Sequence, residues 1–143
     1  MDIRRLTDSY AVSPQISPDD LLAIRDAGFT TIINNRPDGE IPAQLHDAVI
    51  GGVAEALGLT FVTNPVIAGA LSIENVHAQR AAIDAATGPV LAYCASGNRS
   101  SIVWALAHAG RLPIDDLIAL PARHGYRLEG LRPEIEAIAR TVR

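Results

Sequence analysis

The fold is decided by one stretch of the sequence, Tyr93-Cys94-Ala95-Ser96-Gly97-Asn98-Arg99-Ser100-Ser101. The short apolar run 89–92 before it is typical of a buried strand, and the apolar run 102–107 after it is typical of a helix. A tight polar turn between a strand and a helix directs backbone N–H groups, and the positive end of the helix dipole, toward one point in space. The stretch therefore predicts a binding site for an anion.

Two side chains of this loop suit the attack of an anionic substrate. Cys94 is the only cysteine, and a helix N-terminus with a nearby guanidinium favours the nucleophilic thiolate. Arg99 has a planar fork that fits the oxygens of a phosphate, sulfate or thiosulfate. A cysteine after an apolar strand is ordinarily a small buried hydrophobe, but its combination with this arginine predicts a catalytic pair. The expected anion-binding residues are Ala95, Ser96, Gly97, Asn98, Arg99 and Ser100.

Glycine and serine complete the expected loop. Gly97 can take the left-handed conformation that a tight turn needs. The hydroxyl groups of Ser100 and Ser101 are expected to donate to the leaving group or to Cys94 itself. Trp104, on the helix that follows, is expected to lie in the core.

Composition and charge describe an ordinary globular chain. Its 143 residues are 48% hydrophobic and 20% charged, which predicts one domain spanning 1–143. The net charge of −4 is spread along the chain and favours neither a nucleic-acid partner nor a membrane surface. A single cysteine excludes an internal disulfide, and no signal peptide or membrane span is visible, so we expect a cytoplasmic protein.

The sequence gives no sign of a metal or another cofactor. The histidines share no spacing that would form a metal site, and one cysteine is too few for a cysteine-rich one. We expect these histidines on surfaces or helix faces; they are His46, His77, His108 and His124.

Strand-like and helix-like segments alternate over most of the chain. After a possible hairpin in 3–13, the expected strands are 29–34, 59–63 and 89–92, and the expected helices are 17–27, 42–57, 72–86, 101–108, 113–122 and 133–142. Alternation of this kind predicts an α/β fold with a mainly parallel central sheet flanked by helices. Ligands of such sheets bind beyond the carboxyl ends of the strands, where the Cys94 loop, 34–38 and 64–67 all lie.

Several phrases of the sequence resemble one known family. They are Ser13-Pro14-Gln15 before the capped segment Ser17-Pro18-Asp19-Asp20, then Ile33-Asn34-Asn35-Arg36-Pro37-Asp38-Gly39-Glu40, the Cys94 loop, and the tail Gly125-Tyr126 with Leu131-Arg132-Pro133. The chain is similar to the bacterial phosphatase-like domain that occurs alone and within beta-lactamase-hydrolase-like proteins. The resemblance implies a protein-tyrosine-phosphatase-like fold, and either phosphatase or sulfurtransferase activity.

Loop length bears on that choice. Tyrosine and dual-specificity phosphatases resemble one another in a C-x5-R loop, whereas Cys94 and Arg99 form a C-x4-R loop similar to that of rhodanese-type sulfurtransferases. The smaller ring of amides suits a persulfide or a compact thiosulfate. A phosphatase also needs a general acid, and the loop 65–70 expected to carry it has no ionisable residue. Rhodanese loops, however, often have a basic residue where Ala95 stands.

Asp38 is the candidate for the missing acid. It follows a strand end on the same side of the sheet as Cys94, although an aspartate before Gly39 is also typical of a simple turn. Arg36 is a candidate either to help bind the anion or to brace its own loop.

Three hypotheses follow, the first of them favoured. Cys94 attacks a sulfane sulfur, holds it as a persulfide and passes it to a thiol. Alternatively, it forms a phosphocysteine during hydrolysis of a phosphate monoester, with Asp38 as acid. A third hypothesis is a non-catalytic module that binds anions or senses oxidation. The expected partner is a small anionic substrate, a phosphoprotein or a persulfide carrier.

Overall fold

A five-stranded sheet lies at the centre of the computed structural model, which describes residues 1–141. The strands are β1 (Arg4–Thr7), β2 (Tyr10–Ser13), β3 (Thr31–Asn34), β4 (Thr60–Thr63) and β5 (Val90–Tyr93). Their order in the sheet is β1-β2-β5-β3-β4. Among the described strands, β1 and β2 pair antiparallel, as a hairpin, and the other pairs are parallel. The α/β fold with a mainly parallel sheet is therefore confirmed, together with the hairpin.

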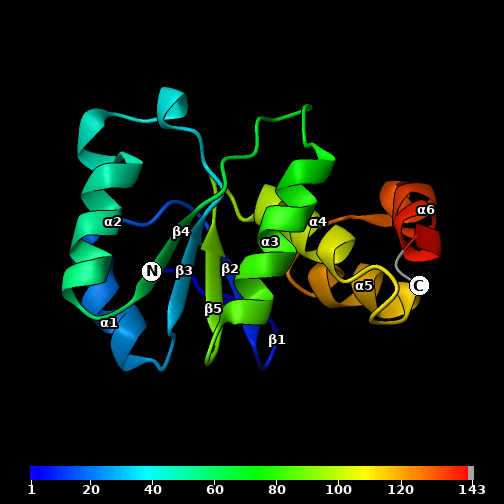
Figure 1. Ribbon diagram of the computed structural model, residues 1–143, viewed down its shortest axis with the longest axis horizontal. Helices are drawn as coiled ribbons and strands as arrows, with labels where there is room; N and C mark the ends of the chain where they lie inside the picture. The colour runs from blue at the N-terminus through cyan, green and yellow to red at the C-terminus, as the bar shows by residue number, and fades with distance from the viewer. Residues whose placement is uncertain (142–143) are drawn as a thin grey trace.

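Helices cover both faces of this sheet (Figure 1). On one side lie α1 (Leu21–Asp26) and α2 (Asp47–Ala56), and on the other α3 (Ile73–Ala85), α4 (Asn98–Ala107), α5 (Ile114–Ala122) and α6 (Arg132–Thr141). Short 3-10 turns stand at Pro18–Asp20, Asp38–Glu40, Ala43–Leu45 and Glu129–Leu131. No helix within residues 1–141 has the length and apolar character needed to cross a membrane.

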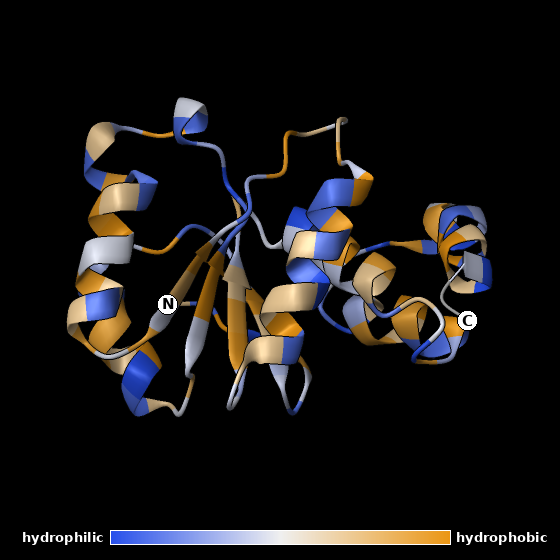
Figure 2. Ribbon diagram, viewed as in Figure 1, coloured by the Kyte–Doolittle hydropathy of each residue, from blue (hydrophilic) through white to orange (hydrophobic). Residues whose placement is uncertain are grey.

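The core is divided by the sheet into two layers. Alternate side chains of a strand point to opposite faces, so Ile32 packs toward α1 and α2 while Ile33 packs toward α3 and α4. Figure 2 shows the strands as the hydrophobic centre between helices whose exposed faces are mixed. Trp104 is fully buried in the second layer, as predicted.

The four parallel strands end level with one another. Tyr93, the last residue of β5, pairs with Ser13 of β2 and with Asn34 of β3, and Asn34 pairs with Thr63 of β4. The segments that follow these four strands therefore start at one edge of the sheet. This register brings together the Cys94 loop, 14–16, 35–40 and 64–71.

Two helix boundaries differ from those predicted. The helix expected from Pro42 begins at Asp47, because His46 is extended (φ −63°, ψ 156°) and separates α2 from a 3-10 turn. The helix expected from Ser101 begins at Asn98, directly after the left-handed Gly97. The final helix was expected to reach Val142, which lies outside the described residues; α6 begins at Arg132.

Candidate active site

The Cys94 loop owes its shape to Gly97. This glycine has φ +95° and precedes the first residue of α4. A Cβ at this position would collide with the hydroxyl of Tyr126 and lie 3.4 Å from Val12. The same hydroxyl donates to the carbonyl of Ser96 at 2.8 Å. The turn thus needs glycine both for its backbone angle and for the close approach of Tyr126.

The sulfur of Cys94 lies inside this turn. Cys94 has no exposed surface, and the N–H of Gly97 donates to its Sγ at 3.1 Å. The N-terminus of α4 starts one residue later, so the positive end of the helix dipole lies beside the sulfur.

Several backbone N–H groups of the loop have no acceptor of their own within residues 1–141. Gly97 donates to Sγ and Asn98 donates to the Ser96 hydroxyl, but no acceptor is found for four others. These four belong to Ala95, Ser96, Arg99 and Ser100. A helix N-terminus leaves such donors available to an anion, and the binding of an anion by this loop stays a prediction.

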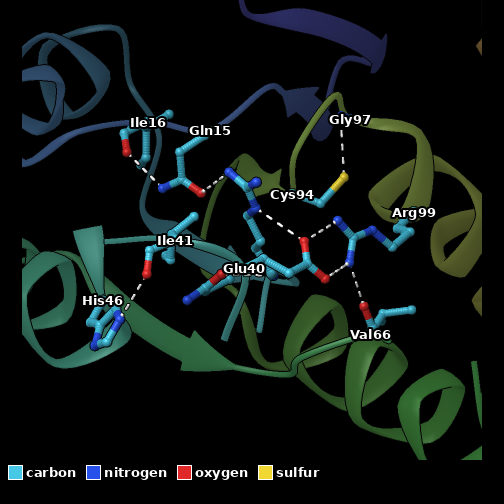
Figure 3. A network of polar contacts seen from close by, with 11 residues as sticks. Gln15, Ile16, Glu40, Ile41, His46, Val66, Cys94, Gly97 and Arg99 are labelled. Atoms are coloured by element: carbon cyan, nitrogen blue, oxygen red, sulfur yellow. Dashed lines mark hydrogen bonds and ion pairs between the residues drawn. The ribbon is translucent and has the colours of Figure 1, made fainter. Parts of the chain in front are cut away.

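Arg99 extends from the first turn of α4 toward the segment that follows β3 (Figure 3). Its Nη1 and Nη2 atoms each lie 2.7 Å from a carboxylate oxygen of Glu40, and Nη1 also donates to the carbonyl of Val66 at 2.8 Å. Its side chain is only 14% exposed. The hydrogen bonds that Arg99 donates to Glu40 raise the pKa of Arg99, and the nearby Cys94 acts in the same direction.

Glu40 was not singled out from the sequence, although it is the acidic residue nearest to this chemistry. Besides Arg99, it accepts from Nε of Arg36 at 3.2 Å, and Arg36 in turn donates to Gln15 at 3.3 Å. Hydrogen bonds from Arg99 and then Arg36 hold the pKa of Glu40 below its ordinary value. The only signal in the sequence was that Arg36 and Glu40 stand four residues apart in the stretch 33–40, which is one of the segments that resemble the family. Arg36 braces Glu40, which agrees with the bracing alternative.

Asp38 lies in the same segment but faces another element. Its Oδ1 accepts the N–H of Asp47 at 2.8 Å, at the start of α2, and its Oδ2 lies 3.9 Å from Nδ1 of His46. Within residues 1–141 we find no hydrogen bond or ion pair between Asp38 and the Cys94 loop. The contacts of Asp38 thus lie with the start of α2, and a catalytic role for Asp38 stays a prediction.

The serine hydroxyls point away from the sulfur, contrary to expectation. Ser100 donates to Oδ1 of Asn35 at 2.9 Å, and Ser101 donates to the carbonyl of Gly97 at 2.8 Å. Both side chains are fully buried. They fix the loop and the first turn of α4, and only the backbone of Ser100 remains available to an anion.

A buried polar network supports the loop from below. The amide of Gln79 in α3 donates to Tyr10 and Asn35 and accepts from Asn35 and Asn64. The hydroxyl of Tyr10 donates to the carbonyl of Ser100 at 3.0 Å. Because unpaired buried polar groups are costly, this network fixes α4 relative to β2, β3 and α3.

No metal cluster accompanies the loop. Within residues 1–141, no three side chains of His, Cys, Asp or Glu gather closely enough to hold a metal ion. The groups that the structure brings together here are the thiol of Cys94, the guanidinium of Arg99, the backbone amides of the loop and the carboxyl group of Glu40.

Comparison with known proteins assigns this arrangement to a family. The model of the "Beta-lactamase hydrolase-like protein, phosphatase-like domain" family matches residues 2–111, which include β1 to β5 and the whole Cys94 loop. The chain belongs to this family. The phosphatase-like domain here shares 33% identity over 130 residues with the beta-lactamase hydrolase-like protein of Xylella fastidiosa (strain Temecula1). That alignment covers 90% of this chain but 30% of the relative, so the chain spans less than a third of that protein.

Solved structures share the phosphatase-like fold. A structure titled "putative phosphatase" from Neisseria meningitidis Z2491 has 35% identity and a TM-score of 0.81, and the match covers 96% of this chain and 99% of that chain. Another with the same description, from Shewanella putrefaciens CN-32, has 19% identity and a TM-score of 0.71, covering 98% and 87%. The Shewanella likeness concerns the fold alone. The protein-tyrosine-phosphatase-like architecture expected from the sequence is confirmed.

Proposed function

We propose that the domain hydrolyses phosphate monoesters through a phosphocysteine on Cys94. The proposal rests on one observation: a carboxyl group, that of Glu40, lies on the fork of Arg99 beside a buried sulfur and a ring of unpaired amides. The absence of an acid from 65–70 had favoured sulfur chemistry. Glu40 removes that objection, because it brings a carboxyl group to the site from a different segment.

The reaction takes two displacements. In the first, Sγ of Cys94 attacks phosphorus, an S–P bond forms and the P–O bond to the leaving group breaks with its electron pair on oxygen. That oxygen takes a proton from a general acid. In the second, water attacks phosphorus after losing a proton to the same group, the S–P bond breaks, and the thiolate and inorganic phosphate are released. The amides of the loop and Arg99 would bind the equatorial oxygens throughout.

Glu40 is our candidate for the acid. While it is paired with Arg99, its pKa is lowered and it stays ionised. A phosphoryl group bound to Arg99 would replace Glu40 as the acceptor of the guanidinium hydrogen bonds. It would also place negative charge beside the carboxylate, and both changes raise the pKa of a carboxyl group. Substrate binding itself would thus help Glu40 to acquire a proton.

The test is hydrolysis of an aryl phosphate by the purified domain, followed by mass spectrometry of rapidly quenched samples. We expect turnover that depends on Cys94, and a mass increase of one phosphoryl group on the peptide that contains it. Absence of turnover on aryl and alkyl phosphates across the pH range would contradict the proposal.

Sulfur transfer remains the second candidate, favoured by the four residues that separate Cys94 from Arg99, one fewer than in a C-x5-R loop. Here Sγ would attack a sulfane sulfur, and the bond to the departing sulfite or thiolate would break with its electron pair on that group, which needs no acid. A thiol acceptor would then remove the sulfur. A mass increase of one sulfur atom on Cys94 after incubation with thiosulfate or a persulfide donor would favour this reaction.

A cytoplasmic location agrees with either reaction. A reducing compartment keeps a lone cysteine as a thiol, which both mechanisms require of Cys94.

A further inference from the structure

A groove adjoins the anion-binding loop at Arg99. It encloses about 420 Å³, and its walls come from the loop after β4, from α4 and from the turn Glu129–Leu131 before α6. Its apolar lining includes Ile67, Leu71, Ile102 and Leu131. Because Arg99 lines both the groove and the catalytic loop, a ligand held by Arg99 would have its remaining atoms beside this apolar wall.

The outer wall of the groove is an exposed apolar side chain. Ile67 is 62% exposed, whereas Leu71, Ile102 and Leu131 are half-buried and pack against the core. Ile67 stands on a turn in which Ala70 donates to its carbonyl at 2.9 Å and Gly69 has φ +77°. Burial of such a side chain against an apolar ligand is favourable.

The distance between this wall and the anion-binding fork is fixed by the backbone. The carbonyl of Val66, next to Ile67, accepts from Nη1 of Arg99, and the N–H of Val66 donates to the carbonyl of Asn35 at 2.8 Å. Val66 itself is buried. The loop is thus tied at one point to Arg99 and to the end of β3, and Ile67 is held close to the fork.

The charged residues of the groove disfavour a ligand that carries a second negative charge. Arg99 is the cation among its lining residues, and Glu134 of α6 is the anion. The loop 65–70 has no ionisable residue. Since Arg99 would be occupied by the first anionic group, a second negative charge on the ligand would meet apolar side chains or Glu134.

We propose that the groove receives the organic group of the substrate, and that the substrate is a small phosphate monoester of an apolar phenol or alcohol without a second negative charge. The phosphate part of this statement rests on the proposed function. The groove and its preference for an apolar group attached to an oxyanion rest on the lining residues alone.

Binding of two analogues that need no turnover tests the proposal. Calorimetry compares inorganic phosphate with phenylphosphonate, which carries the same kind of oxyanion on an apolar ring. We expect phenylphosphonate to bind about tenfold more tightly, from burial of the ring. This ratio should fall to about threefold or less in Ile67→Ser. Leu22→Ser is the matched control, because Leu22 is 50% exposed and lies on α1, across the sheet; it should keep the wild-type ratio.

A charged analogue tests whether the groove disfavours a second negative charge. Phenylphosphonate with a carboxylate on the far side of its ring should bind more weakly than phenylphosphonate, and Glu134→Gln should reduce this difference several-fold. Equal affinities for phosphate and phenylphosphonate, or a ratio that Ile67→Ser leaves intact, would overturn the assignment of the groove. A phosphotyrosine peptide that binds more tightly than phenylphosphonate, through Ile67, would overturn the preference for a small molecule.

The proposed phosphatase activity and the proposed role of the groove can be refuted independently. Groove-dependent binding without any Cys94-dependent hydrolysis would refute the phosphatase but retain the apolar groove. Hydrolysis of aryl phosphates with no effect of Ile67→Ser on the binding ratio would retain the phosphatase and refute the groove.

Discussion

The Cys94 loop and the segment 36–40 meet at the same site but are built differently. The sulfur of the loop is buried, and the loop is held by backbone geometry, by the hydroxyl of Tyr126 and by Ser101. The segment 36–40 is largely exposed, and its carboxylate is positioned by ion pairs with Arg36 and Arg99. In the proposed reaction the first region would provide the nucleophile and the anion cradle, and the second a carboxyl group that an incoming anion would displace.

The largest expected effect concerns the fixed nucleophile. Cys94→Ser keeps the size of the side chain but removes the thiolate, so hydrolysis of an aryl phosphate should fall on the order of 10³-fold or more. Steady-state kinetics measure the loss, and circular dichroism confirms that the variant is folded. Activity retained in a folded variant would mean that Cys94 does not form the covalent intermediate.

The next prediction concerns the contact between Gly97 and Tyr126, as distinct from the strain of a left-handed backbone alone. Gly97→Ala should destabilise the domain by more than ~2 kcal/mol, because left-handed strain costs ~1–2 kcal/mol and the methyl group also displaces Tyr126. Urea unfolding measures the difference. Gly69→Ala is the matched control: Gly69 has φ +77° but nothing within 4 Å of an added Cβ, so only the strain remains. Equal losses in the two variants would contradict a special role for Tyr126.

Removal of the Glu40 carboxylate should change anion binding and turnover in opposite directions. Glu40→Gln removes the charge that competes for Arg99, so inorganic phosphate should bind more tightly while turnover falls on the order of 10²-fold. Asp38→Asn is the matched control from the same turn, since Asp38 contacts α2 instead of Arg99. A larger loss of turnover in Asp38→Asn than in Glu40→Gln would restore Asp38 as the acid.

Stability should depend on pH through the same pair. The pKa of Glu40 is lowered in the folded domain, so the stabilising contribution is present above the ordinary glutamate pKa and is lost as pH falls through the lowered value. The wild type should therefore exceed Glu40→Gln in urea midpoint at neutral pH, with the difference disappearing in acid. A difference that stays constant with pH would show that the charge of Glu40 does not contribute.

The smallest effect concerns the support below the loop. Ser100→Ala removes the hydroxyl that donates to Asn35, and the free energy of unfolding should fall by ~1 kcal/mol. Urea unfolding again measures it. No change would mean that Gln79, which also donates to Asn35 at 3.2 Å, satisfies that amide alone.

The sequence predicted what local patterns determine and missed what depends on distant pairing. The strand, the glycine turn and the helix around Cys94 follow from neighbouring residues, and the parallel sheet follows from alternation. The position of Glu40 depends on Arg99, which is 59 residues away. Likewise, the serine hydroxyls were expected at the sulfur because nothing in the local pattern reveals Asn35, 65 residues from Ser100.

The burial of Cys94 affects how an oxidised thiol could be reduced again. A sulfur without exposed surface admits small molecules such as peroxides more readily than large reductants. Oxidation would give a sulfenic acid, which ordinarily condenses with a second thiol. The chain contains no other cysteine to serve as that thiol. Recovery of the oxidised domain would therefore depend on a small external thiol, such as glutathione, that can enter the loop.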